Sequence, residues 1–213
     1  KEELICDVHT ELIKNGGFEH PIVTTPQEWN IYPSGTPTLE WSVVWLPGAN
    51  SFSSLTRPVL AQLEFQSGVF GWLPFEGHQY VELDADWDGP VGSVTGEPAQ
   101  ISISQMVPTV SGQEYELSFY FSPRPETATA QNSLKVLIDG SLALTVPATA
   151  PSANTSWIHY QHSFVATTTS TLVEFKDAGT PNDSYGTFLD DVSMKCVPEE
   201  EADPHSIVIN EFL

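Results

Sequence analysis

Several side chains in this sequence are of the types that bind sugars. Sugar sites combine an aromatic ring, which stacks on the C–H face of a pyranose, with polar groups that hold the hydroxyls. Three tryptophans in loop-rich stretches are candidates: Trp45, Trp72 and Trp87. Trp72, flanked by Gly71 and Pro74, is the first choice for an aromatic platform, and Trp87 is the second. At least half of the loop tryptophans should instead belong to the core, because tryptophan is a major source of buried area.

Arg124 is a candidate polar partner because the chain has so few cations, with 7 Lys+Arg against 28 Asp+Glu. Pro123 and Pro125 stiffen the backbone on both sides of it and would aim the guanidinium. Two roles are equally open. Arg124 either holds a ligand's carboxylate or hydroxyls, or it neutralises a nearby acid such as Glu126.

A second kind of chemistry is suggested by the run Asp84-Ala85-Asp86-Trp87-Asp88-Gly89. Alternate carboxylates at this spacing can converge on one calcium ion, and the glycine allows a sharp turn. A complete EF-hand is excluded, because its twelfth position is Thr95 and no helices flank the run. A shorter calcium loop and an acidic surface turn both remain. If calcium binds beside Trp87, the ion itself would suit the vicinal hydroxyls of a sugar.

Charge and composition exclude several classes of partner. The formal net charge of −21 repels phosphate backbones and anionic lipid headgroups, whereas divalent cations are natural partners for it. No apolar run reaches the roughly 20 residues that cross a bilayer, and the charged start at Lys1 is not a signal peptide. No nucleophile elbow, histidine-rich zinc motif or phosphate loop is present, so we do not expect an enzyme.

The pattern of the chain predicts an all-β, antiparallel sandwich in a single domain. Alternating segments rich in Val, Ile, Thr, Tyr and Phe are separated by Gly, Pro, Asn and Asp, and helical periodicity is nearly absent. The predicted strands are residues 79–83, 99–106, 114–122, 133–138, 141–146, 157–166, 171–177 and 187–195. Residues 21–76 are expected to form long loops and short strands.

The two ends of the chain are expected to differ from this body. We assign residues 1–197 to the sandwich, 198–206 to an acidic linker and 207–213 to the start of a following domain, similar to the opening strand of a lamin-tail-like module. Cys6 and Cys196 are separated by almost the whole chain, which fits one disulfide in an oxidising compartment better than a metal site. Two free buried thiols are the alternative.

Five short segments, in this order and spacing, resemble the galactose-binding-like jelly-roll superfamily. They resemble carbohydrate-binding modules of families four, nine and twenty-two, and more closely relatives in plant cell walls and bacterial surface proteins, including adhesin-type members. The segments are residues 11–19 (containing Asn15-Gly16-Gly17-Phe18-Glu19), 77–84, 103–105, 112–119 and 189–193 (Leu189-Asp190-Asp191-Val192-Ser193).

This resemblance implies a calcium ion that ties the first strand to the last. Glu19 and Asp190 would be side-chain ligands, with carbonyls near Gly17 and around Glu76 completing a shell of six to eight oxygens. Asp190 and Asp191 face opposite sides of a strand, so only one can reach a given ion, and Asp190 is favoured. The alternative is that Glu19 and Asp190 only cap turns.

Taken together, these features predict a calcium-stabilised, non-catalytic carbohydrate-binding module. It would be secreted or lie on a cell surface, as part of a larger adhesin or polysaccharide-active protein, and its partner would be a polysaccharide or cell-surface glycan rather than nucleic acid or membrane. The alternative function is a structural spacer or protein-binding adhesin domain without a sugar site.

Overall fold

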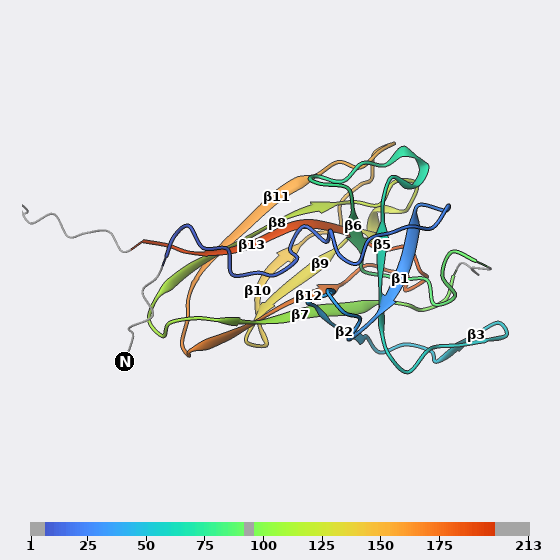
Figure 1. The fold of residues 1–213 in the computed structure, drawn as a ribbon. Helices are drawn as coiled ribbons and strands as arrows, with labels where there is room; N and C mark the ends of the chain where they lie inside the picture. The colour runs from blue at the N-terminus through green and yellow to red at the C-terminus, as the bar shows by residue number, and fades with distance from the viewer. Residues whose placement is uncertain (1–6, 92–95, 199–213) are drawn as a thin grey trace, which may run out of the picture.

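The computed structural model describes residues 7–91 and 96–198, which form a sandwich of two antiparallel sheets (Figure 1). The six-stranded sheet has the order β1 (Trp29–Pro33), β5 (Gln62–Gln66), β6 (Tyr80–Glu82), β13 (Phe188–Cys196), β8 (Glu114–Ser122) and β11 (Ile158–Val165). The five-stranded sheet has the order β10 (Ser141–Val146), β9 (Leu134–Ile138), β12 (Ser170–Asp177), β7 (Ile101–Pro108) and β2 (Ser42–Trp45).

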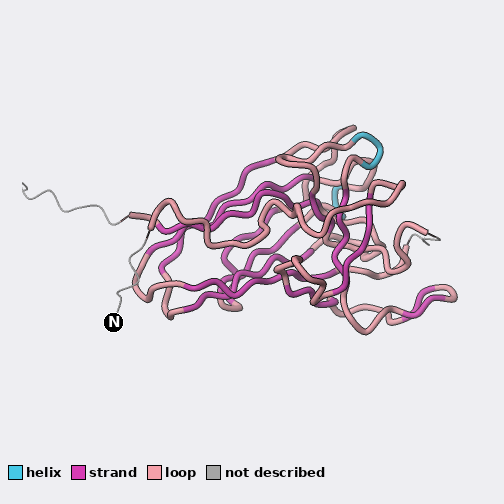
Figure 2. The backbone as a smooth tube through the Cα atoms, in the orientation of Figure 1, coloured by secondary structure: helices cyan, strands magenta, loops and turns pink. Residues whose placement is uncertain are grey.

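Short elements complete the structure. The strands β3 (Ser51–Phe52) and β4 (Leu55–Thr56) pair as a separate hairpin. Two 3-10 turns, η1 (Val69–Gly71) and η2 (Thr129–Gln131), are the helices of the described residues, and they lie among the loops (Figure 2). No helix in this part of the chain is long and apolar enough to cross a membrane.

The predicted fold class is confirmed, and each of the eight predicted segments contains a strand. Residues 114–122 and 141–146 have the predicted bounds, and the other six differ by a few residues at their ends. The loosely patterned stretch 21–76 contributes β1 to β5, which were expected only as unspecified short strands.

The main core lies between the two sheets. Along β8 the side chains alternate, so Tyr115, Leu117, Phe119 and Phe121 all face inward and are at most 3% exposed. Side chains from the opposite sheet, including Phe175 of β12, complete this core. Burying such a strand face is the main driving force for the sandwich.

The outer face of the six-stranded sheet is buried as well at one end. In β5 and β6, Leu63, Phe65 and Val81 point into the main core, so the residues between them point the opposite way. These outer-face residues are Glu64, Gln66, Tyr80 and Glu82, and all four are at most 6% exposed. The segment 67–79 covers this face, and its Trp72 packs with Tyr80 and Phe188 in a second cluster.

The first described segment lies against the last strand, as predicted. The Leu12 amide donates to the Met194 carbonyl at 3.1 Å, and the Val192 amide donates to the Gly16 carbonyl at 3.0 Å. The blue start and the red end of the described chain accordingly lie together in Figure 1. The segment is not a regular strand, however, because Asn15 and Phe18 have positive φ and interrupt the extended backbone.

Two predictions fall partly outside the described residues. Cys6 is not among them, so the Cys6–Cys196 disulfide stays a prediction, and Cys196 itself is buried at the end of β13. The proposed linker and following domain also lie beyond residue 198, except for Pro198 itself.

Candidate functional site

A pocket of ≈ 640 Å³ opens where β1, β5 and the segment 67–79 meet the loops that follow β8 and precede β13. Its walls are unusually aromatic and acidic. The aromatic side chains are Trp29, Phe70, Trp72 and Tyr185, and the acidic ones are Glu28, Glu64, Asp86 and Glu126. Arg124, Gln27, Gln66, Val69 and Ser184 complete the lining.

Arg124 anchors the inner wall of this pocket. Its Nε lies 2.9 Å from Glu82 Oε1, the one ion pair among residues 7–91 and 96–198. Because Nε makes no aligned hydrogen bond, the contact is chiefly electrostatic. The guanidinium carbon lies 5.3 Å from the ring centre of Trp72 and 4.5 Å from that of Tyr185, within the range of cation–π attraction.

A hydrogen-bonded network links two buried acids beneath Arg124. The Gln66 amide nitrogen donates to Glu64 Oε1 at 2.9 Å and to Glu82 Oε2 at 2.6 Å, while the Gln66 oxygen accepts from the Tyr80 hydroxyl at 2.9 Å. The backbone N–H of Gly186 donates to Glu82 at 2.8 Å. Burial raises the pKa of both acids, and their mutual repulsion raises the pKa of Glu64 further.

Asp86 is the least satisfied acid of the pocket. It is 7% exposed, and its Oδ1 has no hydrogen-bond partner among the described residues. The neighbouring acid Glu97 accepts from the backbone N–H of Trp87 at 2.8 Å through one oxygen, and its other oxygen has no partner among the described residues. Burial and contact with Glu97 raise the pKa of Asp86.

Phe70 is the exposed aromatic ring of the pocket, and it was not among the predicted site residues. Its side chain is 78% exposed and its ring centre lies 5.1 Å from that of Trp72. Its φ is +52°. A positive φ is costly for a bulky residue, and strained backbone conformations of this kind cluster at functional sites. The available signal was the pair Gly68 and Gly71, which bracket an apolar side chain in a turn.

The predicted sugar-binding residues are only partly brought together. Trp72 and Arg124 both line the pocket, but Trp72 is 3% exposed with Arg124 over its ring, so it is a wall rather than an open platform. Of the two roles considered for Arg124, neutralising an acid is observed, with Glu82 as the acid rather than Glu126.

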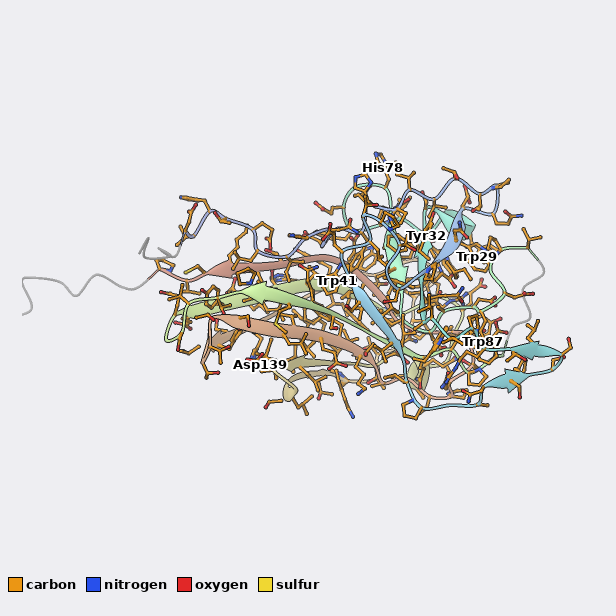
Figure 3. All side chains as sticks on the ribbon, turned by 60° about the horizontal axis from the view of Figure 1, so that its bottom comes forward. Trp29, Tyr32, Trp41, His78, Trp87 and Asp139 are labelled. Atoms are coloured by element: carbon orange, nitrogen blue, oxygen red, sulfur yellow. The ribbon has the colours of Figure 1, made fainter. Side chains whose placement is uncertain are left out.

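Trp45 and Trp87 lie outside the pocket lining. Their ring centres are 6.4 Å apart, edge to face, and the Arg57 guanidinium covers both rings. Trp87 is 5% exposed, which leaves little of its ring for a ligand. Figure 3 places Trp87 near the same end of the sandwich as Trp29, the pocket residue on β1.

The expected convergence of Asp84, Asp86 and Asp88 on one ion is not observed. Asp84 is buried against Asp177 and accepts from the Asp183 N–H at 3.2 Å, whereas Asp86 lines the pocket. Asp88 is exposed, because the chain turns at residues 87–90. Within the described ranges no three His, Cys, Asp or Glu residues are grouped closely enough to hold a metal ion.

Glu19 and Asp190 hold the same segment of the chain from two sides. Glu19 Oε1 accepts from the backbone N–H groups of His78 at 2.8 Å and Gln79 at 3.1 Å. Asp190 Oδ2 accepts from those of Phe75 at 2.8 Å and Glu76 at 3.2 Å. This is the turn-capping arrangement that was the alternative to calcium binding. Burial raises the pKa of Asp190 to about 8.

The acids around this segment lie close enough to influence one another. The pKa of Glu76 is raised by burial and by the charges of Asp191 and Glu19, so the acids repel one another, and a divalent cation would relieve this. Glu76 also lies against Gly17, since a Cβ at Gly17 would be 2.5 Å from Glu76 Oε1.

One family model matches the chain, over residues 94–195, and it is described as a protein of unknown function (DUF642). No curated protein matches the sequence. The matched range begins after β6 and ends within β13, so it excludes the β5–β6 side of the pocket but includes Arg124 and Tyr185.

Solved structures with the same fold include enzymes. A Stig cyclase from Fischerella sp. TAU, in complex with (3Z)-3-(1-methyl-2-pyrrolidinylidene)-3H-indole, has a TM-score of 0.56 at 15% identity, covering 90% of this chain and 99% of that one. An apo cyclase from Fischerella sp. gives 0.56 at 16% identity, covering 90% and 98%. A structure titled "CBM4 structure and function" gives 0.41 at 15% identity, covering 87% and 99%.

These likenesses concern the fold alone. The TM-scores of 0.56 and the sheet order agree with the antiparallel β-sandwich that the sequence pattern had predicted. The TM-score of 0.41 carries no argument about a ligand, and identities of 15–16% transfer no activity from the cyclases.

Proposed function

We propose that this chain is a non-catalytic carbohydrate-binding module and that the pocket beside Phe70 is its binding site. The observation that carries this proposal is the combination of an exposed ring with buried polar groups in one concave surface. Phe70 is 78% exposed at the pocket, and the amide of Gln66 and the guanidinium of Arg124 line the same wall.

The size and chemistry of the pocket support a sugar ligand. Its volume of ≈ 640 Å³ lies within the range of roughly 300–1,000 Å³ typical of small-molecule sites. The Phe70 ring offers a stacking surface for the C–H face of a pyranose. Gln27 and Ser184, which also line the pocket, supply further hydrogen-bonding groups for hydroxyls.

We further propose that the module acts outside the cell, on a polysaccharide or a cell-surface glycan, within a larger protein. The net charge of −21 supports a soluble surface that avoids nucleic acid and anionic lipids. The predicted Cys6–Cys196 disulfide would suit an oxidising compartment.

Calcium binding where the first described segment meets β13 is part of the same proposal. We call this contact, formed by Glu19, Glu76 and Asp190, the terminal clasp. Glu19 and Asp190 would hold the ion with their carboxylates, and carbonyls near Gly17 and Glu76 would complete the shell. When bound, the ion would offset the repulsion among these acids and fix the first segment, the segment 75–79 and β13 to one another. Its role would be structural, because Asp190, the clasp acid on β13, does not line the pocket.

A glycan array followed by calorimetry tests the binding proposal. Saturable binding of at least one glycan class, weakened about fivefold when Phe70 is replaced by alanine, is the expected result. A blank array would leave the protein-binding alternative, which is favoured by the exposed apolar side chains of Phe70 and Leu73, 78% and 66% exposed. Release of reducing sugar from a polysaccharide panel would contradict a non-catalytic role.

A further inference from the structure

The acids of the pocket outnumber its cations. Glu28, Glu64, Asp86 and Glu126 line it, and Arg124 is the basic residue among its lining residues. The charge of Arg124 is already matched by Glu82, 2.9 Å away. An anionic sugar such as a uronate would therefore add a further negative charge to a group of acids that already repel one another, and this repulsion grows as water is excluded.

Asp86 has an acceptor oxygen to which a ligand could donate a hydrogen bond. It is 93% buried, it faces the pocket, and its Oδ1 has no partner among the described residues. The carboxyl group of Glu97, which contacts that of Asp86, also has one oxygen without a hydrogen-bond partner among the described residues. Unpartnered buried acceptors of this kind cost free energy until a donor arrives, and a positively charged donor satisfies them best.

The aromatic walls suit the same kind of ligand. Trp29, Phe70 and Tyr185 line the pocket, and ring faces attract cations within about 6 Å. Arg124 already occupies such a position between Trp72 and Tyr185. An ammonium group entering the pocket would meet both aromatic rings and acidic side chains among the lining residues.

We propose that the pocket recognises a sugar bearing a protonated amine, with the ammonium group held by Asp86 and the aromatic walls. This inference rests on the proposed carbohydrate-binding function and narrows it to a ligand class. Neutral sugars would bind more weakly because they leave Asp86 unpartnered, and uronates would bind most weakly because of repulsion.

The test compares three oligosaccharide probes by titration calorimetry with the full chain. The probes are a glucosamine oligomer, its N-acetylated counterpart and a galacturonate oligomer of equal length. A hydrogen bond to a charged group is worth ≈ 1.5–3 kcal/mol, so the glucosamine oligomer should bind about tenfold or more tightly than its neutral counterpart. Its affinity should also fall with added salt.

Variants identify the group responsible. Asp86→Asn keeps the shape of the side chain and should remove the preference for the amine, so that the glucosamine oligomer and its N-acetylated counterpart bind with similar affinity. Glu114→Gln, an exposed acid at the opposite end of β8 from Arg124, is the matched control and should keep the preference. Thermal unfolding of both variants establishes that they are folded.

The outcomes separate the two proposals. Equal or tighter binding of the neutral or uronate probe would overturn the amino-sugar inference and leave carbohydrate binding standing. Binding of a lysine peptide but of no sugar, or of no probe and no array glycan, would overturn both. If Asp86→Asn folds and keeps the preference for the amine, the assignment to Asp86 is wrong.

Discussion

Glu64 of β5 and Glu82 of β6 stand directly opposite each other in the register of the six-stranded sheet. Like charges in this position destabilise a sheet, and both side chains are nearly fully buried. The pair is tolerated because the Gln66 amide bridges the two carboxyl groups and Arg124 neutralises Glu82. The pocket is therefore built beside two buried acids whose mutual repulsion has to be compensated. Several measurements can test this.

Removing Arg124 should strongly destabilise the fold. Arg124→Met leaves Glu82 buried without its counter-ion, and breaking a buried pair from one side costs about 3–5 kcal/mol. Denaturant unfolding should report that loss in the free energy of unfolding. Lys135→Met removes an exposed cation from β9 and should change stability by less than about 0.5 kcal/mol.

A small effect of Arg124→Met, similar to that of the control, would mean that Glu82 is protonated in the native state. The double variant Arg124→Met, Glu82→Gln should recover part of the loss.

Stability should fall as the pH rises from about 5 to 9. Burial raises the pKa of Asp177 to about 7 and that of Asp190 to about 8. An unfolded aspartate titrates near about 4, so the folded state binds more protons between pH 4 and 8, and unfolding releases them. The stabilisation is therefore fully present below about pH 4 and is lost as the pH passes 7 to 8. Glu64, Glu82 and Asp86 shift in the same direction.

Melting temperatures measured across this range in the presence of EDTA check the sign. Asp177→Asn removes one of the two titrations and should reduce the decline around pH 7. A melting temperature that is flat or rising between pH 5 and 9 would contradict the burial of these acids in an ionisable state.

Strand prediction succeeded where the local pattern and the tertiary environment agree. Around β8 and β10, alternating residues and turn signals at Ser111-Gly112 and Asp139-Gly140 define the elements without further information. β5 also alternates, as Gln62-Leu63-Glu64-Phe65-Gln66, but it was not identified. No feature of the sequence around β5 indicates that the side chains of Glu64 and Gln66 are buried, because the residues that cover them belong to the separate segment 67–79.

The site was predicted in part for the same reason. Arg124 and Trp72 were selected from scarcity of charge and from flanking Gly and Pro, and both line the pocket. Spacing alone suggested that one ion could bind Asp84, Asp86 and Asp88. The spacing does not predict the backbone turn that directs these side chains to different places. Phe70 was missed because its role depends on a left-handed backbone conformation.

Gly16 should tolerate no side chain at the contact between the chain ends. A Cβ there would lie 1.9 Å from the Val192 carbonyl oxygen, which is backbone and has little room to move. Gly16→Ala should cost about 1–3 kcal/mol through overpacking, measured by chemical denaturation. Gly48→Ala is the control, because Gly48 also lacks a positive φ and its Cβ would meet only side-chain atoms, the nearest 3.1 Å away. An equal loss in the two variants would show that the close approach of Gly16 to Val192 is not rigid.

Calcium should stabilise the clasp if the proposed ion binds there. An ion at 100 times its dissociation constant adds about 2.7 kcal/mol, so EDTA should lower the melting temperature and mass spectrometry should find bound metal. Asp190→Asn should abolish the calcium-dependent shift, whereas Asp88→Asn, which alters an exposed acid outside the clasp, should retain it. Melting that is unaffected by EDTA, in a protein without bound metal, would leave Glu19 and Asp190 as turn caps alone.

Replacing Phe70 should separate ligand binding from stability. The ring is 78% exposed and contacts Trp72 only at its edge, so Phe70→Ala should change the free energy of unfolding little. Loss of the stacking surface should weaken glycan binding by roughly 1 kcal/mol, about fivefold, in calorimetric titration. Leu73→Ala is the matched control, because Leu73 is 66% exposed on the same segment but does not line the pocket. Unchanged affinity in Phe70→Ala, or an equal loss in Leu73→Ala, would remove the exposed ring from the binding site and with it the observation on which the proposed function depends.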